Sequence, residues 1–321
     1  MGIKIGDKVG SYRVLRPLGQ GGMGTVFEVE HERLGVHFAL KAFTLADGDR
    51  AFFRKRFFAE GRILARLDDP HVVRVVDLDV EPQSDTPYFV MDLVRGPDGT
   101  PQTLAEVAAA ERISDRQLQI WYEDLRVALE AVHAAGVVHR DIKPENVLID
   151  AHRHVRLTDF GICRVVDESL RSQLEVSRTM NVASTEELRT VLGTVNYLSP
   201  EVRAGAEPGV ADDCYALGVM LFRLLTGVWY APGTNVMDLL RPFDSRWKRI
   251  FAALLAVDPQ QRHMPPLQGK APARTSRLRW AVPLGLVASL ALGAVAFLFV
   301  SEEKDDFSYV DDMLYIPRLA P

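Results

Sequence analysis

The sequence predicts an α+β protein with a strand-rich first part, helices after it and one membrane-spanning helix near its end. Three observations support this prediction. Residues 12–43 alternate apolar and polar positions around glycine turns, a pattern typical of strands. Residues 50–67 and 212–225 carry helical patterns. Residues 281–300 form one long apolar run.

The composition indicates a globular protein. The chain has 321 residues, 47% hydrophobic and 25% charged, so it can form one large two-lobed domain or two ordinary ones. Thirty-eight Lys and Arg residues against 43 Asp and Glu residues give a net charge of -5, and we therefore expect no nucleic-acid partner. Cys163 and Cys214 are too few and too far apart for a disulfide framework or a zinc site, and we interpret both as small buried hydrophobes.

A glycine-rich turn interrupts the predicted strands. Residues 19–24 read Gly-Gln-Gly-Gly-Met-Gly, the spacing G-x-G-x-x-G, and glycines let backbone amides approach a polyphosphate closely. In a dinucleotide-binding fold a helix would follow, whereas residues 25–29 continue as a strand. This favours a hairpin lying over phosphates, and a hairpin with a purely structural role stays open as the alternative.

The next element is a predicted helix over residues 50–67, and one position of its apolar face is charged. Spacings of four and three residues place on this face Phe53, Phe57, Glu60, Leu64 and Leu67. A carboxylate on an apolar face needs a cation, and Lys41 lies within the apolar strand "FALKAF". We therefore predict that Lys41 and Glu60 are partners; the alternative is that either side chain reaches out to solvent.

The stretch "VVHRDIKPENVLID", residues 137–150, packs ionisable groups between two apolar runs. The apolar runs are typical of buried strand or core segments, so the polar residues between them form a loop at the edge of a core. Charges there are tolerated when they bind one another, a metal or a charged ligand, which favours a functional site. A solvated turn that carries charge is the alternative.

The apolar run at residues 281–300 predicts a transmembrane helix. Its twenty residues span about 30 Å at about 1.5 Å per residue, the thickness of a bilayer core, and Ser289 is its only hydroxyl. A buried core helix is the weaker alternative because no domain follows. Four basic residues precede the run, namely Lys270, Arg274, Arg277 and Arg279, whereas the tail after it is mainly acidic. By the positive-inside rule the bulk of the chain is cytoplasmic and the tail is extracytoplasmic.

The remaining boundaries follow from composition. We expect the soluble domain at residues 11–268, a basic linker rich in Pro and Ala at residues 269–279, and a short acidic tail at residues 301–321. The start of the chain lacks an apolar signal region, so we expect no cleavable signal peptide. Within the span, small side chains recur every fourth residue, at Ala281, Gly285, Ser289 and Gly293. This row is a candidate homodimer interface, although small residues are also common in membrane helices.

Taken together, the motifs resemble those of the protein kinases, and most closely the eukaryotic-like (Hanks-type) serine/threonine kinases of bacteria. In chain order they are the glycine loop, Lys41, Glu60, HRD at residues 139–141, Asn146, DFG at residues 159–161 and SPE at residues 199–201. The resemblance covers nearly all of residues 11–262. It implies a bilobal protein kinase fold with an N-lobe at about residues 11–91 and a C-lobe at about residues 95–268.

The resemblance also implies roles for individual residues. Asp141 would orient the attacking hydroxyl, Lys143 would counter charge on the transferring phosphoryl group, and Lys41, positioned by Glu60, would hold the α- and β-phosphates. Asn146 and Asp159 would bind Mg²⁺, with Mn²⁺ as an alternative ion. The implied ATP site comprises Leu18, Gly19, Gln20, Gly21, Gly22, Met23, Gly24, Val26, Ala39, Lys41, Met91, Asp92, Val94, Asn146 and Asp159.

Other residues receive structural roles from the resemblance. His139 would brace the DFG turn, and Arg140 would wait for a phosphate on the activation segment. Asp213 would anchor the catalytic loop. Glu201 and Arg262 would form a buried ion pair in the C-lobe.

Two departures from the family pattern stand out. No serine or threonine between DFG and SPE lies clearly at the usual position of an activating phosphate, so Thr185 or Thr190 is only a guess. The chain from Thr226 to Arg262 is also shorter than is usual in the family. The substrate-docking side of the C-lobe is therefore expected to be reduced.

We expect a membrane-anchored serine/threonine kinase that uses ATP, phosphorylates proteins and itself, and acts in signalling. A catalytically silent pseudokinase scaffold is the alternative, and it is disfavoured because Lys41, Asp141 and Asp159 are all present. A small-molecule kinase is a third option. The stretch at residues 193–201 disfavours it because this stretch resembles a peptide-docking segment.

Overall fold

The structure is a computed structural model that describes residues 2–21, 24–44, 50–160 and 195–267. All the described residues fall within one unit of the chain, residues 1–269. The expected linker, membrane span, dimer row and acidic tail lie outside the described residues. So do the candidate phosphorylation sites Thr185 and Thr190.

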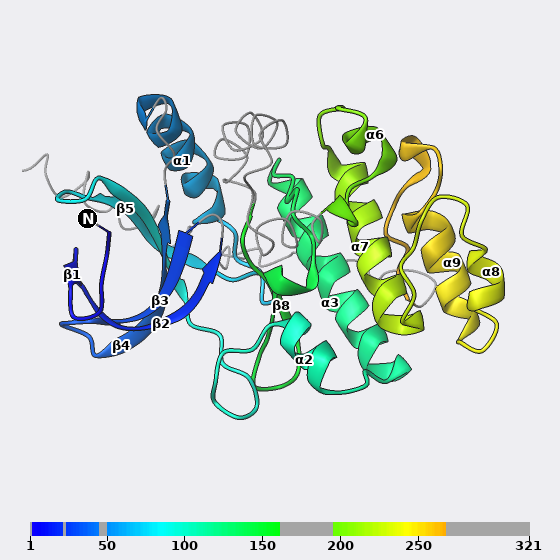
Figure 1. Ribbon diagram of the computed structural model, residues 1–321, viewed down its shortest axis with the longest axis horizontal. Coiled ribbons are helices and arrows are strands. Elements are labelled where there is room, and N and C mark those ends of the chain that lie inside the picture. Colours follow the sequence, from blue (N-terminus) through cyan, green and yellow to red (C-terminus); the bar gives the residue numbers. More distant parts are fainter. Residues whose placement is uncertain (1, 22–23, 45–49, 161–194, 268–321) are drawn as a thin grey trace, which may run out of the picture. The chain divides into compact units, whose positions relative to one another are not determined.

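The first lobe is an antiparallel sheet, as the alternating pattern predicted (Figure 1). Its strands are β1 (Lys8–Val9), β2 (Tyr12–Gly21), β3 (Gly24–His31), β4 (Val36–Phe43), β5 (Val75–Glu81) and β6 (Thr86–Asp92), in the order β1-β2-β3-β4-β6-β5. Alternation sorts the side chains: Tyr12 and Val14 are buried, whereas Arg13 between them is exposed. The glycine turn joins β2 to β3 as a hairpin, which confirms that a strand and not a helix follows the glycines.

Helix α1 (Arg50–Leu64) packs on this sheet through the face that the periodicity predicted. Phe57, Leu64 and Leu67 are buried, and the ring of Phe57 stacks on that of Phe89 with centroids 4.5 Å apart. A side chain at Gly61 would come within 3.0 Å of the Phe89 ring, so glycine permits this close approach. Glu60 is half-buried on the same helix, whereas the side chain of Phe53 lies outside the described ones.

The second lobe is mainly helical. Its helices are α2 (Leu104–Ala110), α3 (Asp115–Ala134), α6 (Pro200–Arg203), α7 (Val210–Thr226), α8 (Val236–Leu239) and α9 (Ser245–Leu254), with short 3₁₀ turns η1 (Pro144–Asn146) and η3 (Pro259–Gln261). A two-stranded ladder, β7 (Val147–Ile149) with β8 (Val155–Leu157), lies beside α3 (Figure 1). The side chain of Ser114 caps the start of α3, as hydroxyls commonly do. Helix α7 is buried continuously over residues 213–222, which confirms the prediction from its apolar character.

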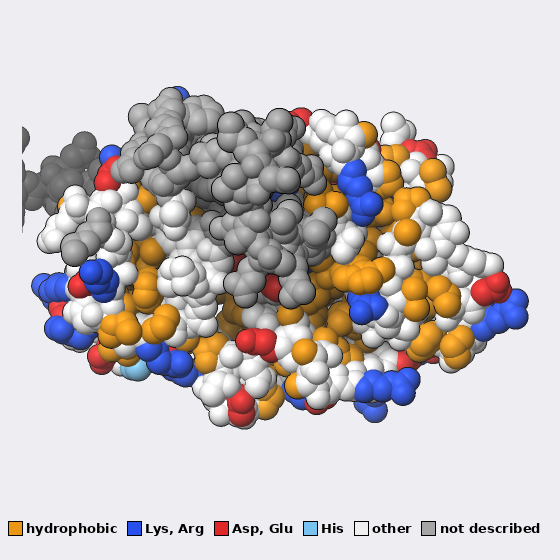
Figure 2. Space-filling model, in the orientation of Figure 1, with side chains coloured by type: hydrophobic (Ala, Val, Ile, Leu, Met, Phe, Trp, Pro, Cys, Tyr) orange, Lys and Arg blue, Asp and Glu red, His pale blue; other side chains and the backbone are white. Residues whose placement is uncertain are grey.

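The end of the second lobe leaves apolar side chains at the surface. Between α7 and α9 there is only the four-residue helix α8, and Val228, Trp229 and Met237 are each more than two-fifths exposed. Figure 2 shows hydrophobic side chains at the surface over this part of the molecule. None of the helices in the described part of the chain has the length and apolar character that crossing a membrane requires.

Candidate active site

One buried carboxylate binds the backbone of the loop that follows α3. Asp213, at the start of α7, accepts hydrogen bonds from the backbone N–H groups of His139 and Arg140, each at 2.8 Å. The Nε2 of His133 lies 2.8 Å from the same carboxylate. Asp213 is 1% exposed, so these contacts take place out of water, where they are strong. The predicted anchoring of this loop by Asp213 is confirmed.

The three polar residues of the loop that the sequence singled out lie together. Lys143 Nζ is 2.8 Å from Asp141 Oδ2, and Asn146 Nδ2 donates to the same oxygen at 2.8 Å. Asn146 Nδ2 also donates to the backbone carbonyl of Asp141 at 2.7 Å. The side-chain nitrogen of Asn146 donates its hydrogen bonds to Asp141. The side-chain oxygen, Oδ1, is therefore the atom of Asn146 that can bind a metal ion.

His139 joins this loop to the segment that carries Asp159. Its Nε2 lies 2.8 Å from the carbonyl oxygen of Thr158, and its ring packs against Phe160 with centroids 4.9 Å apart. The predicted bracing of the DFG turn is therefore confirmed. Burial lowers the pKa of His139, outweighing the nearby carboxylate of Asp213, which acts to raise it. The imidazole is thus neutral at physiological pH.

The backbone at Asp159 and at Arg140 adopts a conformation that is uncommon for residues other than glycine. Their φ angles are 60° and 71°, respectively. Strain of this kind persists only where surrounding contacts enforce it, and it is frequent at active sites. Within the described residues, Arg140 Nε is buried without a hydrogen-bond partner. Its predicted role as a phosphate receptor stays a prediction.

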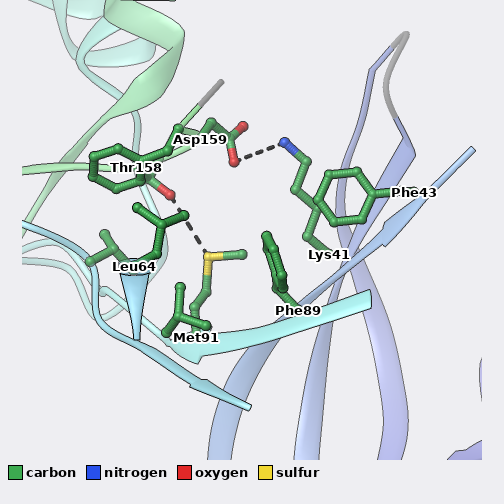
Figure 3. A pocket seen from close by; sticks show the side chains of 10 residues that line it. Lys41, Phe43, Leu64, Phe89, Met91, Thr158 and Asp159 are labelled. Atoms are coloured by element: carbon green, nitrogen blue, oxygen red, sulfur yellow. Dashed lines mark hydrogen bonds and ion pairs between the residues drawn. The ribbon is translucent and has the colours of Figure 1, made fainter. Parts of the chain in front are cut away.

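Lys41 points from β4 toward Asp159 (Figure 3). Its Nζ lies 2.9 Å from Asp159 Oδ1, and the lysine is 7% exposed. The strand therefore directs a charged group into the space between the two lobes, beside the carboxylate predicted to bind metal. The expected pairing of Lys41 with Glu60 stays a prediction.

Apolar residues from both lobes form a single cluster beside these charges. Buried Ala39, Val73, Met91 and Val94 pack together with half-buried Leu18, Val26, Leu93 and Leu148. Five of these eight were predicted as nucleotide-binding residues. Val73, Leu93 and Leu148 were not predicted from the sequence. The period of a strand could have indicated Leu148, because in a strand it faces opposite to its two buried neighbours, Val147 and Ile149.

A pocket adjoins this cluster (Figure 3), since Val73 and Met91 belong to both. It is lined by Lys41, Phe43, Leu64, Val73, Val75, Phe89, Met91, Thr158, Asp159 and Phe160. The hydroxyl of Thr158 lies 3.7 Å from the sulfur of Met91. Helix α1, the sheet and the DFG turn therefore meet around one cavity that includes the Lys41–Asp159 pair.

In the glycine hairpin the backbone at Gly24 lies very close to the backbone of β4. At Gly24 the φ angle is 144°, and a Cβ there would lie 1.9 Å from the carbonyl oxygen of Ala42, so only glycine fits. Gly19, Gln20 and Gly21 end β2 and are exposed, as a loop over a ligand requires. Gly22 and Met23 lie outside the described residues.

The predicted Glu201–Arg262 ion pair is also confirmed. Arg262 donates to both carboxylate oxygens of Glu201, one of them at 3.2 Å, and its Nε donates to the carbonyl of Ala256 at 2.8 Å. The guanidinium also lies 4.8 Å from the ring centroid of Tyr215. Burial acts to raise the pKa of Glu201, but the hydrogen bonds from Arg262 lower it overall.

The donor atoms of the site suit a nucleotide with a hard divalent cation. Asp159 and Asn146 supply oxygen atoms, which Mg²⁺ prefers. They are held in register because Thr158 N–H donates to the carbonyl of Asn146 at 3.0 Å. Lys41 supplies positive charge next to Asp159. The apolar cluster provides surface for an aromatic base, and the residues present therefore fit ATP and Mg²⁺.

Comparisons with known proteins agree with this chemistry. The protein kinase domain family matches residues 12–268. The chain is 36% identical over 221 residues to serine/threonine-protein kinase pkn2 of Myxococcus xanthus, covering 68% of this chain and 24% of the relative. It is 35% identical over 222 residues to PknA of Mycobacterium tuberculosis, covering 68% of this chain and 47% of the relative. With PrkC of Bacillus subtilis it shares 35% identity over 225 residues, 70% of this chain and 32% of the relative.

Solved structures show the same fold. The kinase domain of Mycobacterium tuberculosis PknI superposes with a TM-score of 0.60 at 26% identity, covering 82% of this chain and 94% of that domain. The matched residues span less than half the length of the curated relatives named above.

Proposed function

The chain belongs to the protein kinase family, and from this premise we propose that it transfers the γ-phosphoryl group of ATP to serine and threonine hydroxyls of proteins. The observation that carries the proposal is the contact set of Asp141, whose Oδ2 is held by Lys143 and Asn146. A carboxylate fixed on one oxygen presents the other in a defined direction. Positioning of this kind is the main requirement of phosphoryl transfer.

Each charged residue of the site then has a task. Asp141 Oδ1 accepts the hydrogen bond of the substrate hydroxyl and orients it for attack. Lys143 and Lys41 offset negative charge on the phosphates. Asp159 and Asn146 would hold Mg²⁺, which would offset negative charge on the phosphates. The apolar cluster around Ala39 and Met91 binds the adenine.

The experiment is phosphate transfer from radiolabelled ATP with Mg²⁺, first to the chain itself and then to a general protein substrate. We expect labelling by the parent and a loss of about 100-fold or more in Asp141→Asn and Lys41→Met, since each removes a charge that acts on the reacting groups. Mass spectrometry then identifies the labelled residue. Retained ATP binding with no labelling in the parent would instead indicate a pseudokinase scaffold.

We further propose that residues 281–300 anchor the kinase in the cell membrane, with the kinase domain cytoplasmic and the tail outside. Support comes from the apolar length of the run and from the basic residues before it. The test is protease digestion of right-side-out and inverted vesicles containing the full chain. Recovery in the soluble fraction after cell lysis would contradict the proposal.

The row of small residues in this span supports a further proposal of self-association. Two helices can approach closely along Gly285 and Gly293, which would bring two kinase domains together for phosphorylation in trans. The double substitution Gly285→Leu with Gly293→Leu is expected to abolish crosslinked dimers in membranes. Val287→Leu, which changes a neighbouring position off the row, is the matched control and is expected to leave them intact.

A further inference from the structure

A second cluster of charged and metal-binding side chains lies outside the active site. His71, Asp124 and His154 each direct one nitrogen or oxygen into a common space, and these atoms all lie within 4.8 Å of one another. The three come from separate elements. His71 lies between α1 and β5, Asp124 on α3, and His154 immediately before β8. None of them belongs to the residues of the proposed kinase mechanism.

Backbone hydrogen bonds hold the three elements in place. Leu157 N–H donates to the carbonyl of His71 at 2.7 Å, which pairs β8 with the segment before β5. Val155 N–H, at the other end of β8, lies 3.3 Å from Asp124 Oδ2 and so ties the strand to α3. The cluster is therefore supported by regular structure on each side, as a preorganised site requires.

One backbone contact indicates the tautomer of the His71 ring. Its Nδ1 lies 3.3 Å from the carbonyl oxygen of Val155. A carbonyl only accepts hydrogen bonds, so Nδ1 carries the proton, and in the neutral ring Nε2 then carries a lone pair. That lone pair faces Asp124 Oδ1 at 3.6 Å. Two electron-pair donors therefore face each other across a gap that is longer than a hydrogen bond, an arrangement that a cation between them would stabilise.

The remaining atoms have compatible geometry. His154 Nδ1 lies 2.8 Å from Asp124 Oδ2, and the carboxylate is 8% exposed. Ligand atoms that surround one zinc ion at its usual bond lengths are about 3.3 Å apart in a tetrahedron. The two separations, 3.6 Å to Oδ1 and 2.8 Å to Oδ2, lie on either side of that value, and an ion that binds here replaces the proton by which His154 Nδ1 donates to Oδ2. The side chain of His154 is 47% exposed, which leaves one side open to a solvent ligand.

We propose that His71 Nε2, Asp124 and His154 Nδ1 bind one divalent transition-metal ion of the zinc class. Imidazole nitrogens suit zinc and its neighbours in the first transition row, whereas Mg²⁺ prefers oxygen atoms. The carbonyl of Val155 orients His71 as an outer partner commonly orients a metal-bound histidine. The ion joins α3 to both segments that flank it. It thereby stiffens β8, the strand that leads directly to Thr158 and Asp159.

The test uses the full-length chain without a histidine tag, purified in detergent, stripped with a chelator and supplied with excess Mg²⁺. After dialysis against ZnCl₂, we expect one tightly held zinc per chain by elemental analysis. At zinc about 100 times the dissociation constant, Tm should rise by about 5–10 °C. Substitution with Co²⁺ should give the visible absorption of a low-coordinate nitrogen and oxygen site.

Three variants make the test specific. His154→Ala and Asp124→Asn should each lose the bound zinc and the rise in Tm. His154→Ala changes a half-exposed side chain and is expected to fold. The matched control is His152→Ala, which removes an exposed histidine from the same turn and should bind zinc as the parent does.

Two results would overturn the proposal. One is a parent chain that keeps no zinc and shows no shift in Tm, which would mean that the three side chains bind no ion. The other is equal zinc retention by the parent, His154→Ala and Asp124→Asn, which would place the ion elsewhere. Neither result depends on kinase activity.

Discussion

Two buried aspartates of the helical lobe hold histidines in different ways. Asp213 is 1% exposed and accepts from two backbone N–H groups and from His133, all at 2.8 Å. Asp124 is 6% exposed and has His154 at 2.8 Å and one backbone N–H at 3.3 Å. Its other oxygen faces His71 at 3.6 Å. The first carboxylate accepts a backbone hydrogen bond on each oxygen, whereas one oxygen of the second faces His71 at a distance longer than a hydrogen bond.

The difference shows how to separate a structural carboxylate from a candidate ligand. Burial alone does not distinguish Asp213 from Asp124. The distinction lies in the donors: backbone amides are fixed and cannot be replaced by an ion, whereas an imidazole can exchange its proton for a metal. Substitutions at Asp213 and Asp124 test this distinction directly.

The largest effect is expected from Asp213→Ala. The substitution leaves the buried N–H groups of His139 and Arg140 without an acceptor, so we expect a loss of about 3–5 kcal/mol in the free energy of unfolding. Phosphate transfer should be lost as well, because the same loop carries Asp141. Urea denaturation measures the first effect and the radiolabel assay the second. A loss of stability no larger than that of an ordinary surface substitution would show that Asp213 does not anchor the loop.

A smaller loss is expected from Asp124→Ala in chelator-treated protein. Only one backbone N–H and one imidazole lose their acceptor, and we expect about 1–3 kcal/mol. The comparison with Asp213→Ala should be made by urea denaturation under identical conditions. Equal losses in the two variants would contradict the difference between the carboxylates. Zinc added to Asp124→Ala should not restore stability.

The pH dependence of stability tests His139, the buried histidine of the active-site loop. Burial lowers the pKa of His139 from its ordinary value of 6.5, so below that pH the unfolded chain binds a proton that the folded chain does not. Stability should therefore fall as the pH drops below 6.5, with a contribution approaching about 1.4 kcal/mol per pH unit from this one group. The measurement is urea denaturation between pH 7.5 and pH 5.5, read as a difference between the parent and His139→Asn. Parallel curves would show that His139 does not titrate in this way.

The smallest effect is expected from His152→Ala. The side chain is exposed and lies outside both clusters, so its removal should change the free energy of unfolding by less than about 0.5 kcal/mol. Zinc binding should persist. A change as large as that of His154→Ala would mean that the whole turn, and not the ligand set, supports the second cluster.

The sequence predicted the structure best where the pattern is local, that is, where it lies within one short stretch of the chain. The strand alternation around residues 12–43 predicted the sheet, and the glycine spacing predicted a hairpin, because both patterns are local. The crowded charges of residues 139–146 indicated a site because such groups need partners at the edge of a core. The pairing of Glu201 with Arg262 was implied by the resemblance to protein kinases and not by any local pattern.

Contacts between elements that are far apart in the sequence were predicted less well. An inward-facing Lys41 could be predicted from its strand, but its ion pair with Asp159, on a segment more than one hundred residues later, could not. Val73 and Leu148 were missed in the apolar cluster because each is an ordinary apolar residue whose partners lie in another lobe or another strand.

The sequence by itself thus determined which elements form, which faces they bury and which chemical groups the active site contains. Only the tertiary structure decided which of these groups meet. His71, Asp124 and His154 carry no spacing that identifies a metal site, and they come together because β8 pairs with the segment before β5 while it contacts α3. The physical reason is that periodicity reports the face of one element, whereas a site between elements depends on which faces pack against each other.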